Sequence, residues 1–397
     1  MDTERPRIRL RPKADARRIR HGYPWVHLDD VVTDRRTRAL APGDIAVLED
    51  AERAALATVT VNMASRIAAR VLDADPEATI DGAWIAARIA TAAAHRARLP
   101  GGAFHRLIHA EADGLPGVVI DRFGDAAVLQ PNAAWADARA EDFADALEGL
   151  GIRHVLLNAT GRARGAEGLV DGTRWLRGGL EAPVEVSMNG ATYLADLTGG
   201  QKTGLFYDQR PNHAFVAGLA RGARVLDVFS HVGGFGLAAL AGGAATALAV
   251  DGSAPALDLA ARGAELMGRS GDYATRRGDA FDLMTALGEA GERFDVVVAD
   301  PPAFAPAKPA LTAGLRAYER VARLAAPLVA PGGYLTLCSC SHAADLPKFR
   351  ASCVRGIGRA GRQAQLIHTG FAGPDHPVHP QLAESGYLKA LTFRLLD

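Results

Sequence analysis

The feature that most constrains the fold is an alternation of apolar strand-like runs with helix-like segments in the second half of the chain. Four runs have strand character, at 224–230, 247–253, 294–302 and 333–339. Helices are expected near 211–220, 234–242, 254–267 and 311–330. This alternation predicts a parallel sheet with helices on both faces. Two last runs, 362–370 and 387–396, are expected to form an antiparallel pair.

The first half of the chain has two different patterns. Residues 1–75 contain short strand-like runs separated by Pro and Gly, which predicts a small β-barrel with strands at 7–11, 22–28, 43–50 and 54–61. Residues 76–190 mix helical spacing with strands, and Asn189-Gly190 between alternating runs predicts a hairpin. The expected domains are therefore 1–75, 76–190 and 191–397.

The cysteine content indicates a reducing compartment, whereas the zero net charge by itself argues against a nucleic-acid partner. The formal net charge is zero, yet residues 1–38 hold eleven Lys and Arg against six acids, Arg18 and Arg20 among them. A local basic face is the footprint of phosphate contact, although a merely solvated surface explains it equally well. The three cysteines are too few for a disulfide framework, and no apolar run is long enough for a membrane span. We therefore expect a cytoplasmic protein without a membrane partner.

A glycine-rich turn follows the first strand of the alternating region. The run Leu226–Gly236 has an aspartate, Asp227, within the strand and then Gly233-Gly234-Phe235-Gly236. A dinucleotide-binding turn has the spacing G-x-G-x-x-G, and an acid here would oppose a pyrophosphate. The acid could instead accept hydrogen bonds from an ammonium group or a bound water.

Two further acids are expected close to this turn. Asp251 ends the second strand, where a carboxylate can accept both ribose hydroxyls, and Asp279 is placed to meet an adenine amino group. Each acid alone could be a solvated strand end or a helix cap. Together they favour a cationic nucleoside without phosphate, namely S-adenosylmethionine.

The run Asp300-Pro301-Pro302-Ala303-Phe304 is typical of enzymes that methylate a planar nitrogen-bearing base. Such turns also serve enzymes that methylate exocyclic amines, which need no cysteine. Here Cys338-Ser339-Cys340-Ser341 ends a later strand. Carbon 5 of cytosine becomes nucleophilic once a thiolate adds to carbon 6, and an acid at N3 favours that addition. Cys340 is the expected nucleophile, whereas Cys338 and Cys353 are expected to be buried structural residues.

The chain resembles, over nearly its whole length, the bacterial 23S rRNA 5-methylcytosine methyltransferases of the large-subunit methyltransferase I type. Residues 20–25 and 42–44 resemble that family's PUA domain, and 111–117 its central domain. The runs 200–210, 300–304, 339–341 and 375–378 carry the rest of the resemblance.

The resemblance implies an α/β chain with a PUA-like β-barrel, a central mixed α/β domain and a Rossmann-like class I methyltransferase sheet of seven strands. It places the strands of Asp300 and Cys340 side by side. The cofactor residues that it and the motifs imply are Gln201, Thr203, Phe206, Asp227, Phe229, Ser230, Gly233, Gly234, Phe235, Asp251, Asp279 and Asp300. The substrate residues are Lys202, Arg210, Pro301, Pro302, Phe304 and His376, with Arg18 and Arg20 toward RNA.

Several points stay open in the sequence. Family members often carry Tyr-Thr where this chain has His231-Val232, which removes a hydroxyl. Methylation of another base or of an exocyclic amine is an alternative, as is a non-catalytic RNA-binding assembly factor. Asp375, His376 and His379 lack a fourth ligand, so no metal is expected. The oligomeric state is open, a homodimer included.

Overall fold

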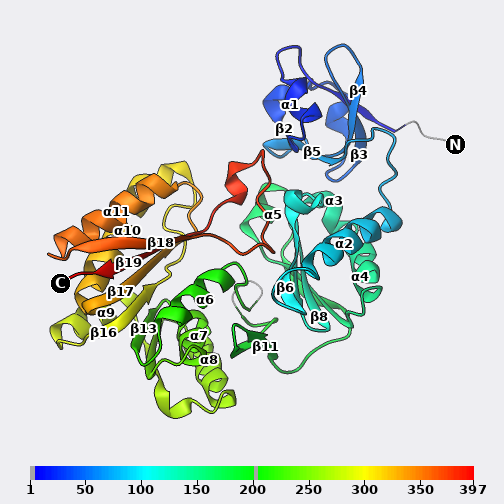
Figure 1. The fold of residues 1–397 in the computed structure, drawn as a ribbon. Coiled ribbons are helices and arrows are strands. Elements are labelled where there is room, and N and C mark those ends of the chain that lie inside the picture. Colours follow the sequence, from blue (N-terminus) through cyan, green and yellow to red (C-terminus); the bar gives the residue numbers. More distant parts are fainter. Residues whose placement is uncertain (1–4, 201–203) are drawn as a thin grey trace. The chain divides into compact units, whose positions relative to one another are not determined.

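The computed structural model describes residues 5–200 and 204–397. The chain forms two compact units, whose elements are labelled in Figure 1. Unit 1 comprises Met1–Glu181 with Asp375–Ser385, and unit 2 comprises Ala182–Pro374 with Gly386–Asp397. A segment from near the end of the chain therefore completes unit 1, which the sequence does not predict.

The first sheet of unit 1 has five strands in the order β1-β3-β4-β5-β2. Its elements are β1 (Arg7–Arg9), α1 (Ala16–Arg20), β2 (Trp25–His27), β3 (Ile45–Glu49), β4 (Ala55–Val61) and β5 (Ile67–Asp73). A bridge between Leu10 and Val31 joins the segments after the two edge strands, so the sheet closes as the predicted barrel does. The sequence missed β5, because Arg66 and Arg70 interrupt its apolar alternation.

The second sheet of unit 1 also has five strands, in the order β10-β9-β8-β7-β6. Its elements are α2 (Gly82–Arg96), β6 (Phe104–His109), β7 (Val118–Phe123), β8 (Ala126–Pro131), α3 (Ala134–Asp137), α4 (Ala140–Glu148), β9 (His154–Ala159), α5 (Arg162–Ala166) and β10 (Gly172–Arg177). Only β8 and β9 pair in parallel. Trp135 and Phe143 are buried in its core.

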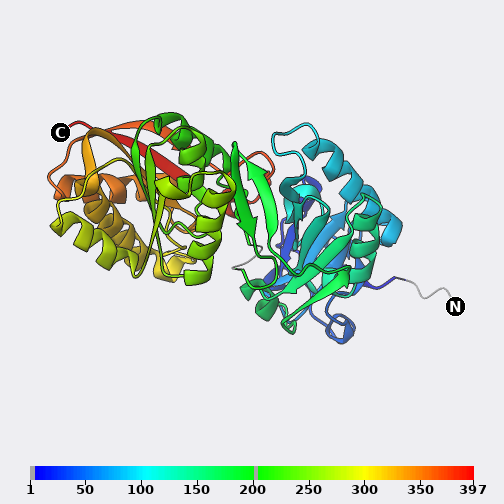
Figure 2. The same ribbon diagram turned by 90° about the horizontal axis from the view of Figure 1, so that it is seen from below.

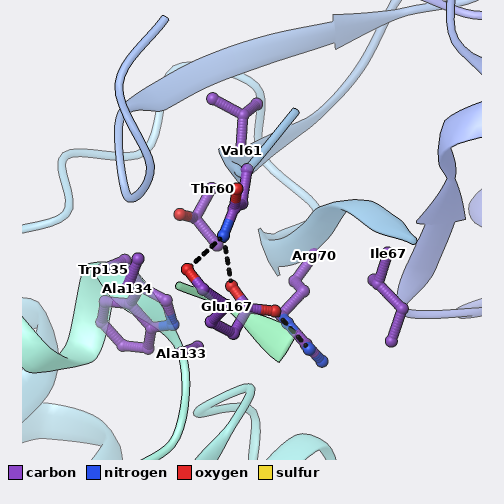
Figure 3. Close-up of a pocket in the computed structure, with 9 residues that line it drawn as sticks. Thr60, Val61, Ile67, Arg70, Ala133, Ala134, Trp135 and Glu167 are labelled. Atoms are coloured by element: carbon purple, nitrogen blue, oxygen red, sulfur yellow. Dashed lines mark hydrogen bonds and ion pairs between the residues drawn. The ribbon is translucent and has the colours of Figure 1, made fainter. Parts of the chain in front are cut away.

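A buried ion pair joins the two sheets of unit 1. The carboxylate of Glu167 accepts from Arg70 Nη2 at 3.0 Å and from Asn62 Nδ2 at 2.9 Å (Figure 3). Arg70 Nη1 also donates to Glu111 Oε1 at 2.9 Å. Removing Arg70 would leave the buried carboxylate of Glu167 without its cation, so we expect such a change to be strongly destabilising.

Unit 2 begins with a hairpin and continues with a seven-strand sheet. Asn189 and Gly190 have φ of 53° and 77°, as a type I′ turn requires, between β11 (Val184–Met188) and β12 (Ala191–Ala195). The sheet order is β15-β14-β13-β16-β17-β19-β18, with β19 alone antiparallel to its neighbours. The strands are β13 (Arg224–Val228), β14 (Thr246–Asp251), β15 (Tyr273–Arg277), β16 (Phe294–Ala299), β17 (Val329–Ser339), β18 (Ala364–Gly370) and β19 (Lys389–Leu395).

Helices cover both faces of this sheet (Figure 2). One group comprises α6 (Arg210–Leu219), α7 (Gly234–Ala241) and α8 (Ala254–Leu266), and the other comprises α9 (Ala280–Glu289), α10 (Leu311–Ala325) and α11 (Leu346–Arg359). Short 3-10 helices occupy turns, at Leu28–Asp30, Thr37–Ala39, Ala110–Asp113, Ser270–Asp272, Lys308–Ala310, Ala326–Leu328 and Ala383–Ser385. No helix in the described ranges is both long and apolar enough to cross a bilayer.

Most long helices begin at a side chain that caps their first turn. Asp81 caps α2, Ser253 caps α8, Asp279 caps α9 and Asp345 caps α11. Such caps satisfy N–H groups that have no partner within the helix. Helix α7 instead begins at Gly233, whose φ is 83° and which has no capping side chain. The N–H groups in the first turn of α7 must therefore find acceptors elsewhere in the fold.

The close packing of α10 on α11 depends on Gly356. An added Cβ there would lie 2.4 Å from the carbonyl oxygen of Glu319 and 2.6 Å from Ala322 Cβ. We expect Gly356→Ala to destabilise the protein by about 2–3 kcal/mol, because backbone must move to admit the methyl group. Gly358→Ala is the matched control, since a Cβ at Gly358 meets nothing within 4 Å. Urea unfolding measures both, and equal stability of the two variants would contradict the packing argument.

Candidate active site

The glycine turn forms a tight loop at the carboxyl end of β13. Phe229 and His231 have φ of 64° and 50°, a left-handed conformation that costs free energy outside glycine. The N–H of Ser230 donates to the carbonyl of Val250 on β14 at 3.0 Å, and Ser230 O accepts from Gly233 N at 2.8 Å. Neighbouring strands thus hold the strained loop in place.

The glycines of this turn are required by side chains packed against them. A Cβ on Gly233 would lie 2.5 Å from the hydroxyl of Tyr273, and one on Gly234 would lie 2.9 Å from His213 Nε2. His213 and Tyr273 were not among the residues expected at the site. Their signal in the sequence is weak, because each is an isolated residue far along the chain from the turn.

Asp227 supplies the cap that α7 otherwise lacks. Its Oδ2 accepts from the N–H of Gly236 at 2.8 Å, and the carboxyl group is fully buried. Burial, together with the nearby charge of Asp251, raises the pKa of Asp227 to about 7. Among the described residues, Asp227 Oδ1, Ser230 Oγ and the Tyr273 hydroxyl are buried without a hydrogen-bond partner. Their hydrogen-bonding capacity is therefore not used by the protein groups that the structure describes.

The carboxylates of Asp251 and Asp279 accept hydrogen bonds from backbone N–H groups. Asp251 Oδ2 accepts from His231 N at 2.9 Å and Oδ1 from Ser253 N at 2.8 Å. Asp279 Oδ1 accepts from Phe281 N at 2.8 Å and from Asp282 N at 3.2 Å. Asp279 follows β15, a polar edge strand that the sequence did not predict because its residues are exposed. Both acids nevertheless stand at the carboxyl edge of the sheet.

Asp300 follows β16 directly, and its side chain is bonded to Gln209, the residue before α6. Its Oδ2 accepts from Gln209 Nε2 at 2.9 Å, and Gln209 Oε1 accepts from Asn212 Nδ2 at 2.6 Å. Gln209 is buried, and it belongs to the run that matched the family before the sheet begins. The neutral amide of Gln209 thereby helps to orient the carboxylate of Asp300.

The two cysteines of β17 differ in accessibility. Strands β16 and β17 pair in parallel with Ala299 opposite Leu337, so Asp300 and Cys338 follow at the same level. Cys338 is 1% exposed, and burial raises its pKa well above the usual range. Cys340 lies beyond the strand end and is partly exposed, whereas Cys353 is buried in α11. Of the three thiols, Cys340 is the accessible one.

Ser341 ties the turn after Asp300 to the turn after β17. Its hydroxyl accepts from the N–H of Ala305 at 2.8 Å and lies 2.6 Å from the hydroxyl of Tyr318 on α10. The ring of Tyr318 packs on Phe304 with centroids 5.0 Å apart. The sequence analysis assigned no role to Ser341 or Tyr318, although Ser341 is part of the same short run as Cys340.

The remaining expected residues of unit 2 occupy the same edge or its surroundings. Phe206 packs on His231 with ring centroids 5.2 Å apart, and Phe229 packs on Phe281 at 6.3 Å. Pro301 is buried and Pro302 exposed, while Phe235 is buried in α7 and Arg210 is buried at the start of α6. Gln201, Lys202 and Thr203 lie outside the described residues.

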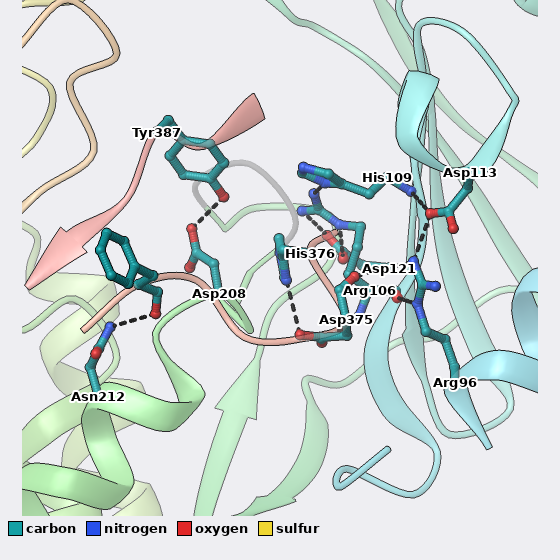
Figure 4. A network of polar contacts seen from close by, with 11 residues as sticks. Arg96, Arg106, His109, Asp113, Asp121, Asp208, Asn212, Asp375, His376 and Tyr387 are labelled. Atoms are coloured by element: carbon teal, nitrogen blue, oxygen red, sulfur yellow. Dashed lines mark hydrogen bonds and ion pairs between the residues drawn. The ribbon is translucent and has the colours of Figure 1, made fainter. Parts of the chain in front are cut away.

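The segment that contains His376 belongs to unit 1 (Figure 4). His376 is buried, with Nδ1 3.0 Å from Asp375 Oδ1, and Asp375 Oδ2 accepts from Arg106 N at 3.1 Å. Its ring lies 5.2 Å from that of His109, whose pKa burial lowers to about 2. These contacts hold the segment in unit 1. No group of three His, Cys, Asp or Glu in the described ranges is arranged to hold a metal ion.

Arg18 and Arg20 lie in α1 of unit 1 and are exposed. The Cζ of Arg18 lies 3.4 Å from the centroid of the Tyr23 ring, and Arg20 Nη2 lies 2.5 Å from Asp50 Oδ2. One charge is therefore stacked on an aromatic face and the other is paired with a carboxylate. Such pairs at the surface contribute little to stability.

Comparison with known proteins gives two family matches. Residues 141–394 match the family described as S-adenosylmethionine-dependent methyltransferase, and residues 8–74 match the PUA-like domain. A putative S-adenosylmethionine-dependent methyltransferase from Streptococcus mutans has the same fold, with a TM-score of 0.81, 18% identity, and coverage of 98% of this chain and 100% of that chain. A putative methyltransferase complexed with SAH gives the same TM-score of 0.81 at 18% identity, covering 98% and 99%.

Curated relatives resemble the chain along its length. The ribosomal RNA large subunit methyltransferase of Deinococcus radiodurans is 35% identical over 98% of both chains. The ribosomal RNA large subunit methyltransferase I of Aeromonas salmonicida is 38% identical over 83% of this chain and 85% of its own. That of Cronobacter sakazakii is 35% identical over 94% and 96%. The chain therefore belongs to the family of S-adenosylmethionine-dependent methyltransferases that includes the ribosomal RNA large subunit methyltransferase I proteins.

Proposed function

We propose that this methyltransferase forms 5-methylcytosine in large-subunit ribosomal RNA, through a covalent bond between Cys340 and carbon 6 of the base. The observation that carries the proposal is the accessible thiol of Cys340 at the end of β17, beside the strand that delivers Asp300. Methylation of an exocyclic amine needs no thiol, so the pair favours carbon chemistry over amine chemistry. The relatives' names supply the RNA class.

The residues at the glycine turn fit S-adenosylmethionine. The orphaned Oδ1 of Asp227 and the hydroxyl of Ser230 can accept from an ammonium group, and a buried carboxyl with a pKa of about 7 gains most from a cation. Asp251 would then receive the ribose hydroxyls and Asp279 the adenine amino group. When bound, the cofactor supplies the methyl group. Phe206 and Phe229 are proposed as further cofactor residues, as are Gln201 and Thr203, which lie outside the described residues.

In the reaction, the thiolate of Cys340 adds to carbon 6 of cytosine, and the former double-bond electrons make carbon 5 nucleophilic. The cofactor, when bound, would supply the methyl group that this nucleophilic carbon accepts. A base removes the carbon 5 proton, the double bond re-forms, and the thiolate leaves. Each bond made to the enzyme is thus broken again.

Asp300 would act at N3 of the cytosine ring. In its protonated form the carboxyl can donate there as the thiolate adds, which draws electron density from carbon 6. Gln209 keeps the side chain oriented through its bond to Oδ2. Pro301, Pro302 and Phe304 shape the turn against which the base would lie, and His376 and Arg210 would border the RNA.

RNA binding is proposed for the N-terminal part of the chain. We assign residues 1–75 to a PUA-like domain, 76–190 to a substrate-associated domain and 191–397 to catalysis. The exposed guanidinium groups of Arg18 and Arg20 can contact phosphates, and recognition of RNA by shape and backbone suits such a face. The proposed substrate places the enzyme in the cytoplasm, where bacteria make their ribosomes.

The binding of S-adenosylmethionine should depend on the ionisation of Asp227. We expect affinity to increase about tenfold between pH 6 and pH 8, because the carboxyl with a pKa of about 7 must lose its proton to attract a cation. The stability of the protein without ligand should change in the opposite direction. Its free energy of unfolding should decrease as the pH rises from about 4 to 7, because Asp227 ionises more easily in the unfolded chain. Calorimetry measures the affinity. Asp227→Asn should abolish the pH dependence, adenosine serves as the uncharged control ligand, and pH-independent affinity of the wild type would contradict this role.

The thiol of Cys340 should be essential for turnover. We expect Cys340→Ala to form no 5-methylcytidine in large-subunit RNA while still binding S-adenosylmethionine, because only the covalent step is lost. Cys353→Ala is the matched control, since Cys353 is buried in α11. Nucleoside digestion with mass spectrometry identifies the product. Turnover by Cys340→Ala refutes the covalent step, and a different methylated nucleoside from the wild type refutes the substrate.

A further inference from the structure

Lys389 is a buried cation at the first position of β19. It is 4% exposed and lies opposite Ser339 in the antiparallel register of β17 and β19. Cys340 is the residue directly after Ser339. Lys389 therefore lies beside the last residue of β17, directly before the proposed nucleophile.

The turn that follows Cys340 wraps around the ammonium group of Lys389. Its Nζ donates to the carbonyl of Ser341 at 2.7 Å and to the carbonyl of Ala344 at 2.8 Å. Both acceptors are neutral backbone groups. Burying a lysine with neutral acceptors is costly, because an ammonium loses its hydration. A hydrophobic residue at position 389 would pack equally well in the sheet. The buried charge of Lys389 therefore suggests an interaction with a negative group.

The charge of Lys389 interacts with the thiol of Cys340. Burial lowers the pKa of Lys389 to about 8, while the negative charges of Cys340 and Asp345 raise it. The lysine therefore stays largely protonated at neutral pH. An interaction between two charges is mutual: if a Cys340 thiolate favours the ammonium, the ammonium favours the thiolate.

Two other described titratable groups interact with Cys340. From α10, Tyr318 is neutral at physiological pH, because burial raises its pKa. From β17, Cys338 is neutral for the same reason. His342, two residues beyond Cys340, is exposed to solvent.

We propose that Lys389 is a positioning residue that holds the turn of residues 341–344 and favours the thiolate form of Cys340 through its charge. The proposal deepens the function given above and rests on Cys340 being the nucleophile. The preference for thiolate is a property of the free enzyme, so it can be measured without RNA or cofactor.

The test is the pH profile of Cys340 alkylation by iodoacetamide, followed by peptide mass spectrometry. We expect Lys389→Met to raise the midpoint for Cys340 by about one pH unit and to slow alkylation at pH 7 about tenfold. Lys389→Arg keeps the charge and should keep the midpoint close to that of the wild type. The rate at high pH, where every thiol is ionised, reports accessibility separately.

Lys348→Met is the matched control for the loss of one positive charge. Lys348 pairs with Asp345 at the start of α11, and its side chain is 51% exposed. We expect the Cys340 midpoint to be unchanged in this variant. A Lys389→Met midpoint equal to that of the wild type overturns the proposal, whatever the rate at high pH. Turnover by Cys340→Ala would refute the proposed function instead, so the two failures are distinguishable.

A reciprocal measurement covers the case in which Lys389→Met does not fold. In Cys340→Ser the lysine loses its charged neighbour, so the pKa of Lys389 should fall when followed by NMR of the lysine side chains. An unchanged pKa of Lys389 in Cys340→Ser overturns the proposal independently of any substitution at Lys389.

Discussion

The structure of the candidate active site depends on one hydrogen-bonded hydroxyl, that of Ser341. It binds the N–H of Ala305 and the hydroxyl of Tyr318, and so joins the turn after β16 to the turn after β17. Parallel pairing of these strands brings their ends to one edge of the sheet. The Ser341 link adds to this pairing by fixing the turn after Asp300 against the turn after Cys340.

Charged groups are arranged along this edge of the sheet. Asp227 is buried and caps the first turn of α7, and the amide of Gln209 donates to Asp300. Lys389 is buried at the other end, bonded to backbone carbonyls. Charges in a low dielectric interact strongly with a ligand or with each other. In our proposal this edge favours a cationic cofactor on one side and a thiolate on the other.

The elements predicted correctly from the sequence are those that hydrophobic periodicity or turn residues specify locally. The strands that contain Asp227 and Asp251, and those that directly precede Asp300 and Cys340, are apolar runs, and the Asn189-Gly190 hairpin formed as expected. Strands β5 and β15 were missed because arginines and exposed residues hide their alternation. Gln209, Ser341 and Lys389 could not be found from local pattern. Their roles arise from contacts between segments far apart in the chain, and family resemblance alone pointed to the first of them.

The central claim is that Cys340 bonds covalently to a cytosine ring. RNA that carries 5-fluorocytidine tests it most directly, because fluorine at carbon 5 cannot leave as a proton and the adduct persists. With S-adenosylmethionine present, the account predicts a stable complex whose digestion yields a methylated fluorocytidine on the peptide of Cys340. Absence of any adduct, or an adduct on Cys338 instead, would contradict it.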